Sequence, residues 1–167
     1  MAILCKEDVL ILFNRYKEIV HLINENNNGQ SRNMLIKQIQ IPVNLSHSIA
    51  YLYLLNNPGL LGINKIKSDL LKEGSHRTYD LLYGINKVIK IEVKASGTSN
   101  FQRFRKKAIS SNLVIWLKFH DDNLYDVAVF SPLILNAKGK IEVEVNWDNI
   151  IKKKGVRLIN NLNLENL

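Results

Sequence analysis

Two neighbouring stretches decide the fold of this chain: Thr78-Tyr79-Asp80-Leu81-Leu82-Tyr83 and Val88-Ile89-Lys90-Ile91-Glu92-Val93-Lys94. Both have the composition of β-strands, in which successive side chains point to opposite faces. In the second stretch the apolar side chains point to one face, and Lys90, Glu92 and Lys94 point to the other. In the first stretch Asp80 lies on the face opposite Tyr79, Leu81 and Tyr83. The pattern predicts a hairpin with one core face and one charged face.

The segment between the two strands, Gly84-Ile85-Asn86-Lys87, is a turn by composition, because Gly and Asn tolerate positive φ. A three-residue loop over 85–87 places Asp80 directly across from Glu92, with the Cβ atoms about 4.5 to 5.5 Å apart. A five-residue loop slips the register by two residues and keeps both acids on the same face. A one-residue slip would separate them, but it would also misalign the apolar faces.

Two carboxylates this close raise each other's pKa unless a cation lies between them. Oxygen ligands suit Mg²⁺, which binds through one or two carboxylates and completes its shell with water and substrate phosphate oxygens. Lys94, two residues beyond Glu92 on the same face, can orient or deprotonate an attacking water or neutralise charge on a phosphate. The chemistry favoured is phosphodiester hydrolysis. The alternative is a solvent-exposed strand face whose alternating charges have little energetic consequence.

At these residues the chain resembles the PD-(D/E)XK nuclease superfamily, which includes most type II restriction endonucleases. The matching positions are Asp80, Glu92 and Lys94, and Tyr79 stands where the motif has Pro. The resemblance covers roughly residues 68–131. It implies that Asp80 and Glu92 are metal ligands, that the main-chain carbonyl of Val93 is a third ligand, and that Lys94 acts at the water. It also implies a restriction-endonuclease-like mixed β-sheet flanked by helices.

Two further side chains are auxiliary candidates. Many members of the superfamily carry another acid ahead of the first strand; Glu73, which follows a short helix expected over 65–72, could supply it, and so could Glu18. Gln102 resembles a glutamine that some restriction endonucleases carry after the Glu-x-Lys strand. We expect a helix from about Asn100, with Phe101, Phe104 and Ala108 as its core stripe. Its basic face would contact the DNA backbone without reading sequence, through Arg103, Arg105, Lys106 and Lys107.

Composition is consistent with an anionic partner. The 167 residues carry a formal net charge of +8 and an apolar fraction of 46%, as expected for one basic globular domain. Cys5 is the single cysteine, which excludes an internal disulfide and a cysteine-based zinc cluster. No apolar run approaches about 20 residues, and the first residues lack the basic region of a signal peptide. We expect a cytoplasmic protein of a bacterium or archaeon.

The whole chain, 1–167, is predicted to be a single α/β nuclease domain: a helical segment over 1–62 followed by a catalytic core over 63–167. Apolar periodicity and turn residues predict helices over 6–26, 31–40 and 46–55. Further strands are expected over 113–119, 125–130 and 141–145, of which 141–145 should be the last, and a short helix is expected over 147–154. The sheet should have about four or five strands, with the hairpin at its centre.

The function expected from these observations and the resemblance is Mg²⁺-dependent cleavage of double-stranded DNA at a short specific sequence. A homodimer is expected from the resemblance, and a symmetric dimer would recognise a palindrome. One alternative keeps the chemistry and changes the role, to a repair or junction-resolving nuclease. Another is a DNA-binding module without hydrolysis, in which helices near 44–57 contact DNA and the two acids are incidental.

Overall fold

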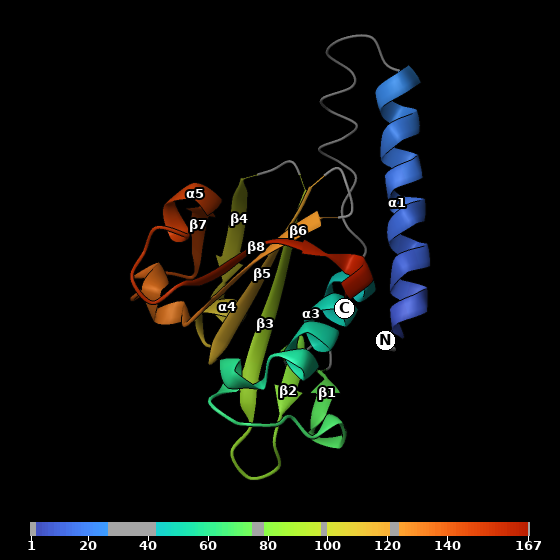
Figure 1. Cartoon of the computed structure of the whole chain (residues 1–167). Coiled ribbons are helices and arrows are strands. Elements are labelled where there is room, and N and C mark those ends of the chain that lie inside the picture. The colour runs from blue at the N-terminus through green and yellow to red at the C-terminus, as the bar shows by residue number, and fades with distance from the viewer. Residues whose placement is uncertain (1–2, 27–42, 75–78, 98–99, 121–123, 167) are drawn as a thin grey trace.

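The computed structural model describes residues 3–26, 43–74, 79–97, 100–120 and 124–166 (Figure 1). The helix expected over 31–40 lies outside these residues. Short 3-10 turns occupy Pro58–Leu61, Ser68–Leu70, Pro132–Leu135 and Leu164–Asn166. The other elements are, in chain order, α1 (Lys6–Asn26), α3 (Val43–Asn56), β1 (Leu71–Glu73), β2 (Leu81–Tyr83), β3 (Ile89–Ser96), β4 (Phe101–Arg105), α4 (Lys106–Ile109), β5 (Leu113–Phe119), β6 (Leu124–Phe130), β7 (Glu142–Asn146), α5 (Trp147–Ile150) and β8 (Arg157–Asn163).

The main sheet has six strands in the order β1-β2-β3-β5-β6-β8. Strands β3 and β5 are parallel and every other neighbouring pair is antiparallel, so the sheet is mixed. A second sheet pairs β4 with β7. The expected α/β class, with a mixed sheet flanked by helices, is confirmed, although the main sheet has six strands rather than four or five.

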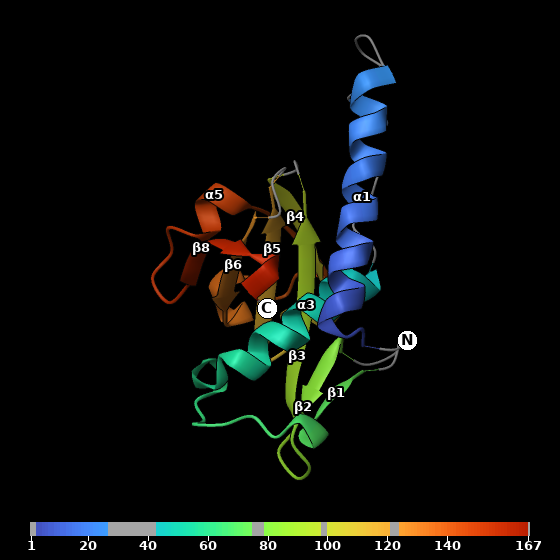
Figure 2. The same cartoon turned by 45° about the vertical axis from the view of Figure 1, so that its right-hand side comes forward.

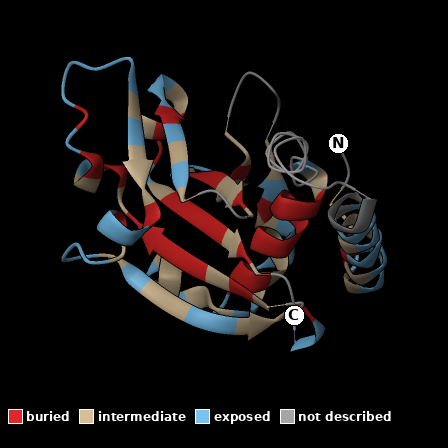
Figure 3. Ribbon diagram, turned by 90° about the horizontal axis from the view of Figure 1, so that it is seen from above, coloured by how far each residue is buried: buried red, intermediate tan, exposed pale blue. Residues whose placement is uncertain are grey.

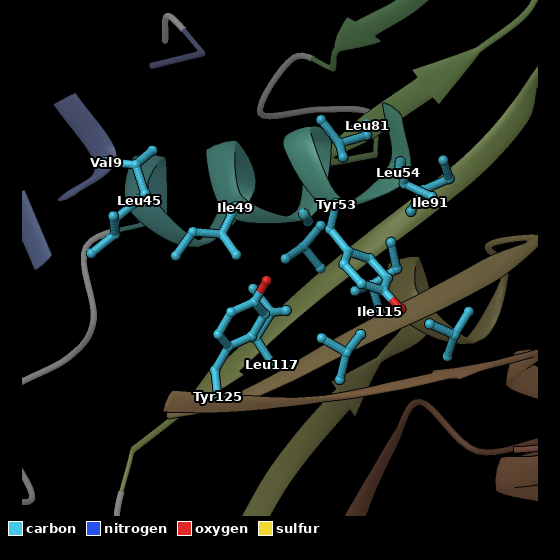
Figure 4. Packing of buried hydrophobic residues seen from close by; sticks show 14 of the residues in the cluster. Val9, Leu45, Ile49, Tyr53, Leu54, Leu81, Ile91, Ile115, Leu117 and Tyr125 are labelled. Atoms are coloured by element: carbon cyan, nitrogen blue, oxygen red, sulfur yellow. The ribbon is translucent and has the colours of Figure 1, made fainter. Parts of the chain in front are cut away.

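One face of the sheet is covered by α3. Its side chains Ile49, Tyr53 and Leu54 are buried over β3, β5 and β6, where Ile115, Leu117 and Tyr125 are also buried (Figure 4). Because α3 is rich in apolar residues and carries no Asp, Glu, Lys or Arg, it can be enclosed between the sheet and other elements.

Helix α1 has the bounds expected from its periodicity and packs beside α3. Val9 and Phe13 are buried in its first half, and the Phe13 ring lies 5.4 Å from that of Phe119. Its later part extends beyond the sheets in Figures 1 and 2, and Ile19 and Leu22 there are exposed. No helix in the described part of the chain is long and apolar enough to cross a bilayer.

The opposite face of the sheet is covered by β4, β7, α4 and α5. Its core is aromatic: Trp116 on β5 contacts Phe104 on β4 and Trp147 on α5, with ring centroids 5.6 and 5.0 Å apart in edge-on geometry. The Trp116 indole donates to the Ser96 hydroxyl over 3.0 Å. Figure 3 shows the buried positions running along the central strands between the two covering layers.

The prediction of a helix from about Asn100 is wrong. Residues Phe101–Arg105 form β4, and only one helical turn, α4, follows. The apolar spacing from Phe101 to Phe104 fits a helix, but the segment also fits a strand in which Phe104 is buried while Arg103 and Arg105 are exposed. The segment forms a strand because it pairs with β7, which supplies a complementary edge and two glutamates opposite the arginines.

Three smaller expectations also fail. The helix over 65–72 is replaced by a 3-10 turn and β1. The helix over 147–154 is limited to α5 at Trp147–Ile150. The strand near 141–145 is present as β7, but it is not the last, since β8 follows. Strand β8 lacks an alternating pattern: it contains Asn161 with φ of 55° and pairs irregularly with β6.

Candidate active site

The hairpin has the predicted register. Leu81 pairs with Ile91 and Tyr83 pairs with Ile89, so the same register continued by one residue sets Asp80 across from Glu92. Gly84 opens the turn with φ of 106°, and a Cβ atom there would lie 2.8 Å from the carbonyl oxygen of Lys87. Only glycine fits this position without strain. Local turn chemistry therefore determines where the two acids meet.

Asp80 lies directly before β2, and its side chain continues the pairing with β3. Its Oδ2 accepts a hydrogen bond of 2.8 Å from the main-chain N–H of Val93. On the other edge of β3, the main-chain N–H and C=O of Lys90 both bond to Asn112. In a β-strand the N–H and C=O of one residue point to the same edge of the strand, and those of the next residue point to the opposite edge. The Val93 carbonyl therefore faces the same edge of β3 as the Val93 N–H, the edge on which Asp80 lies.

Glu92 is a buried acid, with its side chain only 5% exposed. Its Oε1 accepts a hydrogen bond of 2.9 Å from Nζ of Lys94, the next residue on the same face of β3. Its Oε2 is buried and accepts no hydrogen bond from the residues that the structure describes. A buried carboxylate is costly without cationic partners, so Glu92 depends on the groups around it. The alternative of a solvent-exposed charged face does not hold for this residue.

Lys107 joins the two acids, although the sequence pattern predicted a role for it in contact with the DNA backbone. Its Nζ donates to Asp80 Oδ1 over 2.7 Å and lies 3.6 Å from Glu92 Oε2. Burial by itself would lower the pKa of Lys107, but the hydrogen bond to Asp80 and the charges of Asp80 and Glu92 outweigh it and raise the pKa above its ordinary value. Asp80, Glu92, Lys94 and Lys107 together are called the acid–lysine cluster below.

His47, which the sequence analysis did not connect with the hairpin, approaches the cluster from α3. It is buried, with Nε2 3.7 Å from Asp80 Oδ1 and Nδ1 3.8 Å from Glu73 Oε1. The one signal in the sequence is a histidine in a helix that contains no Asp, Glu, Lys or Arg. Glu73, at the end of β1, thus approaches the cluster from the far side of His47. Glu18 lies on the exposed surface of α1, where it pairs with Arg15.

Gln102 and the remaining basic residues lie on β4 and at the start of α4. Gln102 Nε2 donates to the main-chain carbonyl of Ala95 over 2.6 Å, so it ties β4 to the end of β3. Arg103 and Arg105 are exposed and pair across the strand with Glu144 and Glu142, at 3.1 and 3.0 Å. Lys106 is exposed. These three basic side chains remain candidates for contact with phosphate, on a strand and its end rather than on a helix.

The donor set fits a hard divalent cation. The described residues contain no group of three or more His, Cys, Asp and Glu side chains arranged to hold a metal. Mg²⁺, however, is usually bound through only one or two carboxylates and completes its shell with waters and substrate phosphate oxygens. Asp80 and Glu92 both lie near one ammonium group, Glu92 Oε2 is buried and accepts no hydrogen bond from the described residues, and the Val93 carbonyl faces the edge of β3 on which Asp80 lies. These oxygens are the ones that the resemblance implies as metal ligands.

No protein-family model, curated protein or solved structure matches this chain. The resemblance to the PD-(D/E)XK nucleases therefore rests on the hairpin residues themselves. The chemistry open to the acid–lysine cluster follows from its own geometry and charge.

Proposed function

We propose that this chain is a Mg²⁺-dependent endonuclease that hydrolyses phosphodiester bonds of double-stranded DNA at a short specific sequence, as type II restriction endonucleases do, and that it acts as a homodimer. The observation that carries the proposal is the convergence of Asp80, buried Glu92 and Lys94 across one hairpin. Burying an acid of this kind reduces stability unless it has partners, and such costs concentrate at functional sites.

Each member of the cluster has a distinct task. Asp80, Glu92 and the Val93 carbonyl would hold the Mg²⁺, which when bound supplies Lewis-acid polarisation of the scissile phosphate. Lys94 is 23% exposed, and its Nζ lies 2.9 Å from Glu92 Oε1. Its ammonium group can therefore reach a water or a phosphate oxygen next to the acids, orient the attacking water and neutralise charge that develops on the phosphate.

The exposed basic side chains of β4 and the start of α4 support the choice of a polyanionic substrate. Arg103, Arg105 and Lys106 are exposed on β4 and at the start of α4, and the chain as a whole carries a net charge of +8. Contacts of this type position the phosphate backbone and carry no sequence information. The glutamates that pair with the two arginines are exposed as well, so phosphates can compete for these arginines at little cost.

The proposal is tested by incubating long double-stranded DNA with the protein in Mg²⁺ and in EDTA. Discrete fragments are expected in Mg²⁺ alone, and they should be lost in the Asp80→Asn and Lys94→Met variants. Lys90→Met is the matched control, because the Lys90 side chain lies on the same strand face but is exposed and, among the interactions described, contacts only the Tyr79 ring. This variant should cut normally.

Other outcomes would change the proposal in defined ways. A metal-dependent smear, or cleavage of branched DNA only, would favour a repair or junction-resolving nuclease with the same chemistry. DNA that is bound equally by all variants and never cut, over a large collection of sequences, would favour the DNA-binding module. Sedimentation with and without DNA would test the homodimer.

A further inference from the structure

Lys107 occupies a position in the acid–lysine cluster that its place in the sequence does not explain. It belongs to α4, a single helical turn anchored by the buried side chain of Ala108. Its neighbour Lys106 is exposed, whereas the Lys107 side chain is 35% exposed and reaches back to the hairpin. Two residues of the same type, adjacent in the chain, thus have different surroundings.

The Lys107 ammonium group lies where a cation shared by Asp80 and Glu92 would lie. It is 2.7 Å from Asp80 Oδ1 and 3.6 Å from Glu92 Oε2, so it bonds to the first acid and only approaches the second. Lys94 already bonds to the other oxygen of Glu92. Two acids and two lysines balance each other, and this balance removes the repulsion that two adjacent carboxylates would otherwise suffer.

The same balance of charge opposes the binding of a divalent cation. Mg²⁺ binds carboxylate oxygens at about 2.0–2.1 Å with near-octahedral geometry, so an ion held by Asp80 Oδ1 and Glu92 Oε2 together would occupy the space between them where the Lys107 ammonium group lies. A second positive charge beside Lys107 is also unfavourable at this separation in a partly buried site. A cation that enters the cluster must therefore displace the Lys107 ammonium group from Asp80.

We propose that Lys107 is the internal counter-cation of the metal-free site, and that a divalent metal binds by exchange with it. Lys107 thereby holds the two acids in register when no metal is present, as a positioning residue. Once displaced, its ammonium group remains on a partly exposed side chain beside the cluster, where it can contact the substrate phosphate. This inference rests on the proposed function in so far as Asp80 and Glu92 take the metal.

Calorimetric titration of Mg²⁺ or Mn²⁺ without DNA tests the exchange. The Lys107→Met variant lacks the competing cation and is expected to bind the metal about tenfold more tightly than the wild type, which corresponds to about 1.4 kcal/mol. Lys106→Met is the matched control and should leave the affinity unchanged. An affinity of Lys107→Met that equals or falls below that of the wild type would overturn the proposal.

Thermal unfolding provides a second readout. Without metal, Lys107→Met should melt at a lower temperature than the wild type, and metal should raise its melting temperature by more. If this variant does not fold, Lys107→Gln keeps a hydrogen-bond donor to Asp80 without the charge, and the same gain in metal affinity is expected from it.

The outcomes separate this inference from the proposed function. Metal binding by Lys107→Met or Lys107→Gln but not by the wild type would support the exchange. Cleavage and metal binding by the wild type, with equal affinity in the variants, would overturn the exchange and leave the nuclease proposal standing. No metal binding by any of the proteins would overturn the exchange and remove the metal-based mechanism as well.

Discussion

Asp80 makes two contacts that a pair of substitutions can separate. Its Oδ2 accepts the main-chain N–H of Val93, and its Oδ1 pairs with Lys107. Asp80→Asn keeps an acceptor oxygen for Val93 and removes the charge, whereas Asp80→Ala removes both contacts. Both variants should lose metal-dependent cleavage, but they should differ in stability.

The size of the difference follows from the two contacts. A hydrogen bond to a charged acceptor contributes about 1.5–3 kcal/mol, and the Val93 amide has no strand partner once Asp80 is truncated, because β2 begins at Leu81. The pair with Lys107 contributes less, roughly 0.5–1 kcal/mol, since the lysine is about a third exposed and solvent screens it. Asp80→Ala should therefore lower the free energy of unfolding by about 3 kcal/mol, and Asp80→Asn by about 1 kcal/mol.

Urea denaturation in EDTA measures both values. Trp116 and Trp147 are buried and contact each other, so their fluorescence should report the unfolding of the aromatic core. Lys90→Met controls for the loss of a charge on the same hairpin. Equal losses in the two Asp80 variants, or a loss below about 1 kcal/mol for Asp80→Ala, would refute the conclusion that this side chain completes the pairing of β2 with β3.

Three further perturbations follow from the same geometry. Gly84→Ala should cost about 1–3 kcal/mol in urea denaturation, because the turn needs a positive φ and leaves no room for a Cβ atom; an unchanged stability would contradict the turn. Replacing Arg103 and Arg105 together by Gln should reduce the slope of log affinity for DNA against log salt by about 1.8 if both contact phosphate, and an unchanged slope would show that they do not. The raised pKa of Lys107 means that its contribution to stability is complete below its unfolded pKa of about 10.4 and is lost as the pH rises through the higher folded value. Lys107→Met should therefore lose stability less steeply above about pH 10 than the wild type, and parallel curves of unfolding free energy against pH would count against the ion pair.

The centre of the candidate site could be predicted from the sequence because it depends on local geometry. Alternation along β3 assigns Glu92 and Lys94 to one face, and the turn after Gly84 determines the register that brings Asp80 opposite Glu92. The bounds of α1 were also predicted, since a long amphipathic period is a strong signal. In each case the deciding interactions lie within about twenty residues of one another.

The segment from Phe101 to Lys107 shows where local patterns fail. Its apolar spacing satisfies both a helix and a strand, and the glutamates and apolar residues of β7, some forty residues later, decide for the strand. That choice moves Lys107 from the expected outer face of a helix to the hairpin. The role of a residue so close to the motif was therefore decided by a partner strand far along the chain.

The sequence alone thus determined the acids, their shared face and the turn that pairs them, because strand alternation and positive φ act between near neighbours. Only the tertiary structure decided which groups surround those acids. His47 arrives from α3 and Lys107 from α4, and neither shares a periodic pattern with β3. Their positions depend on how two layers pack onto opposite faces of the sheet, and packing is a property of the folded chain as a whole rather than of any single segment.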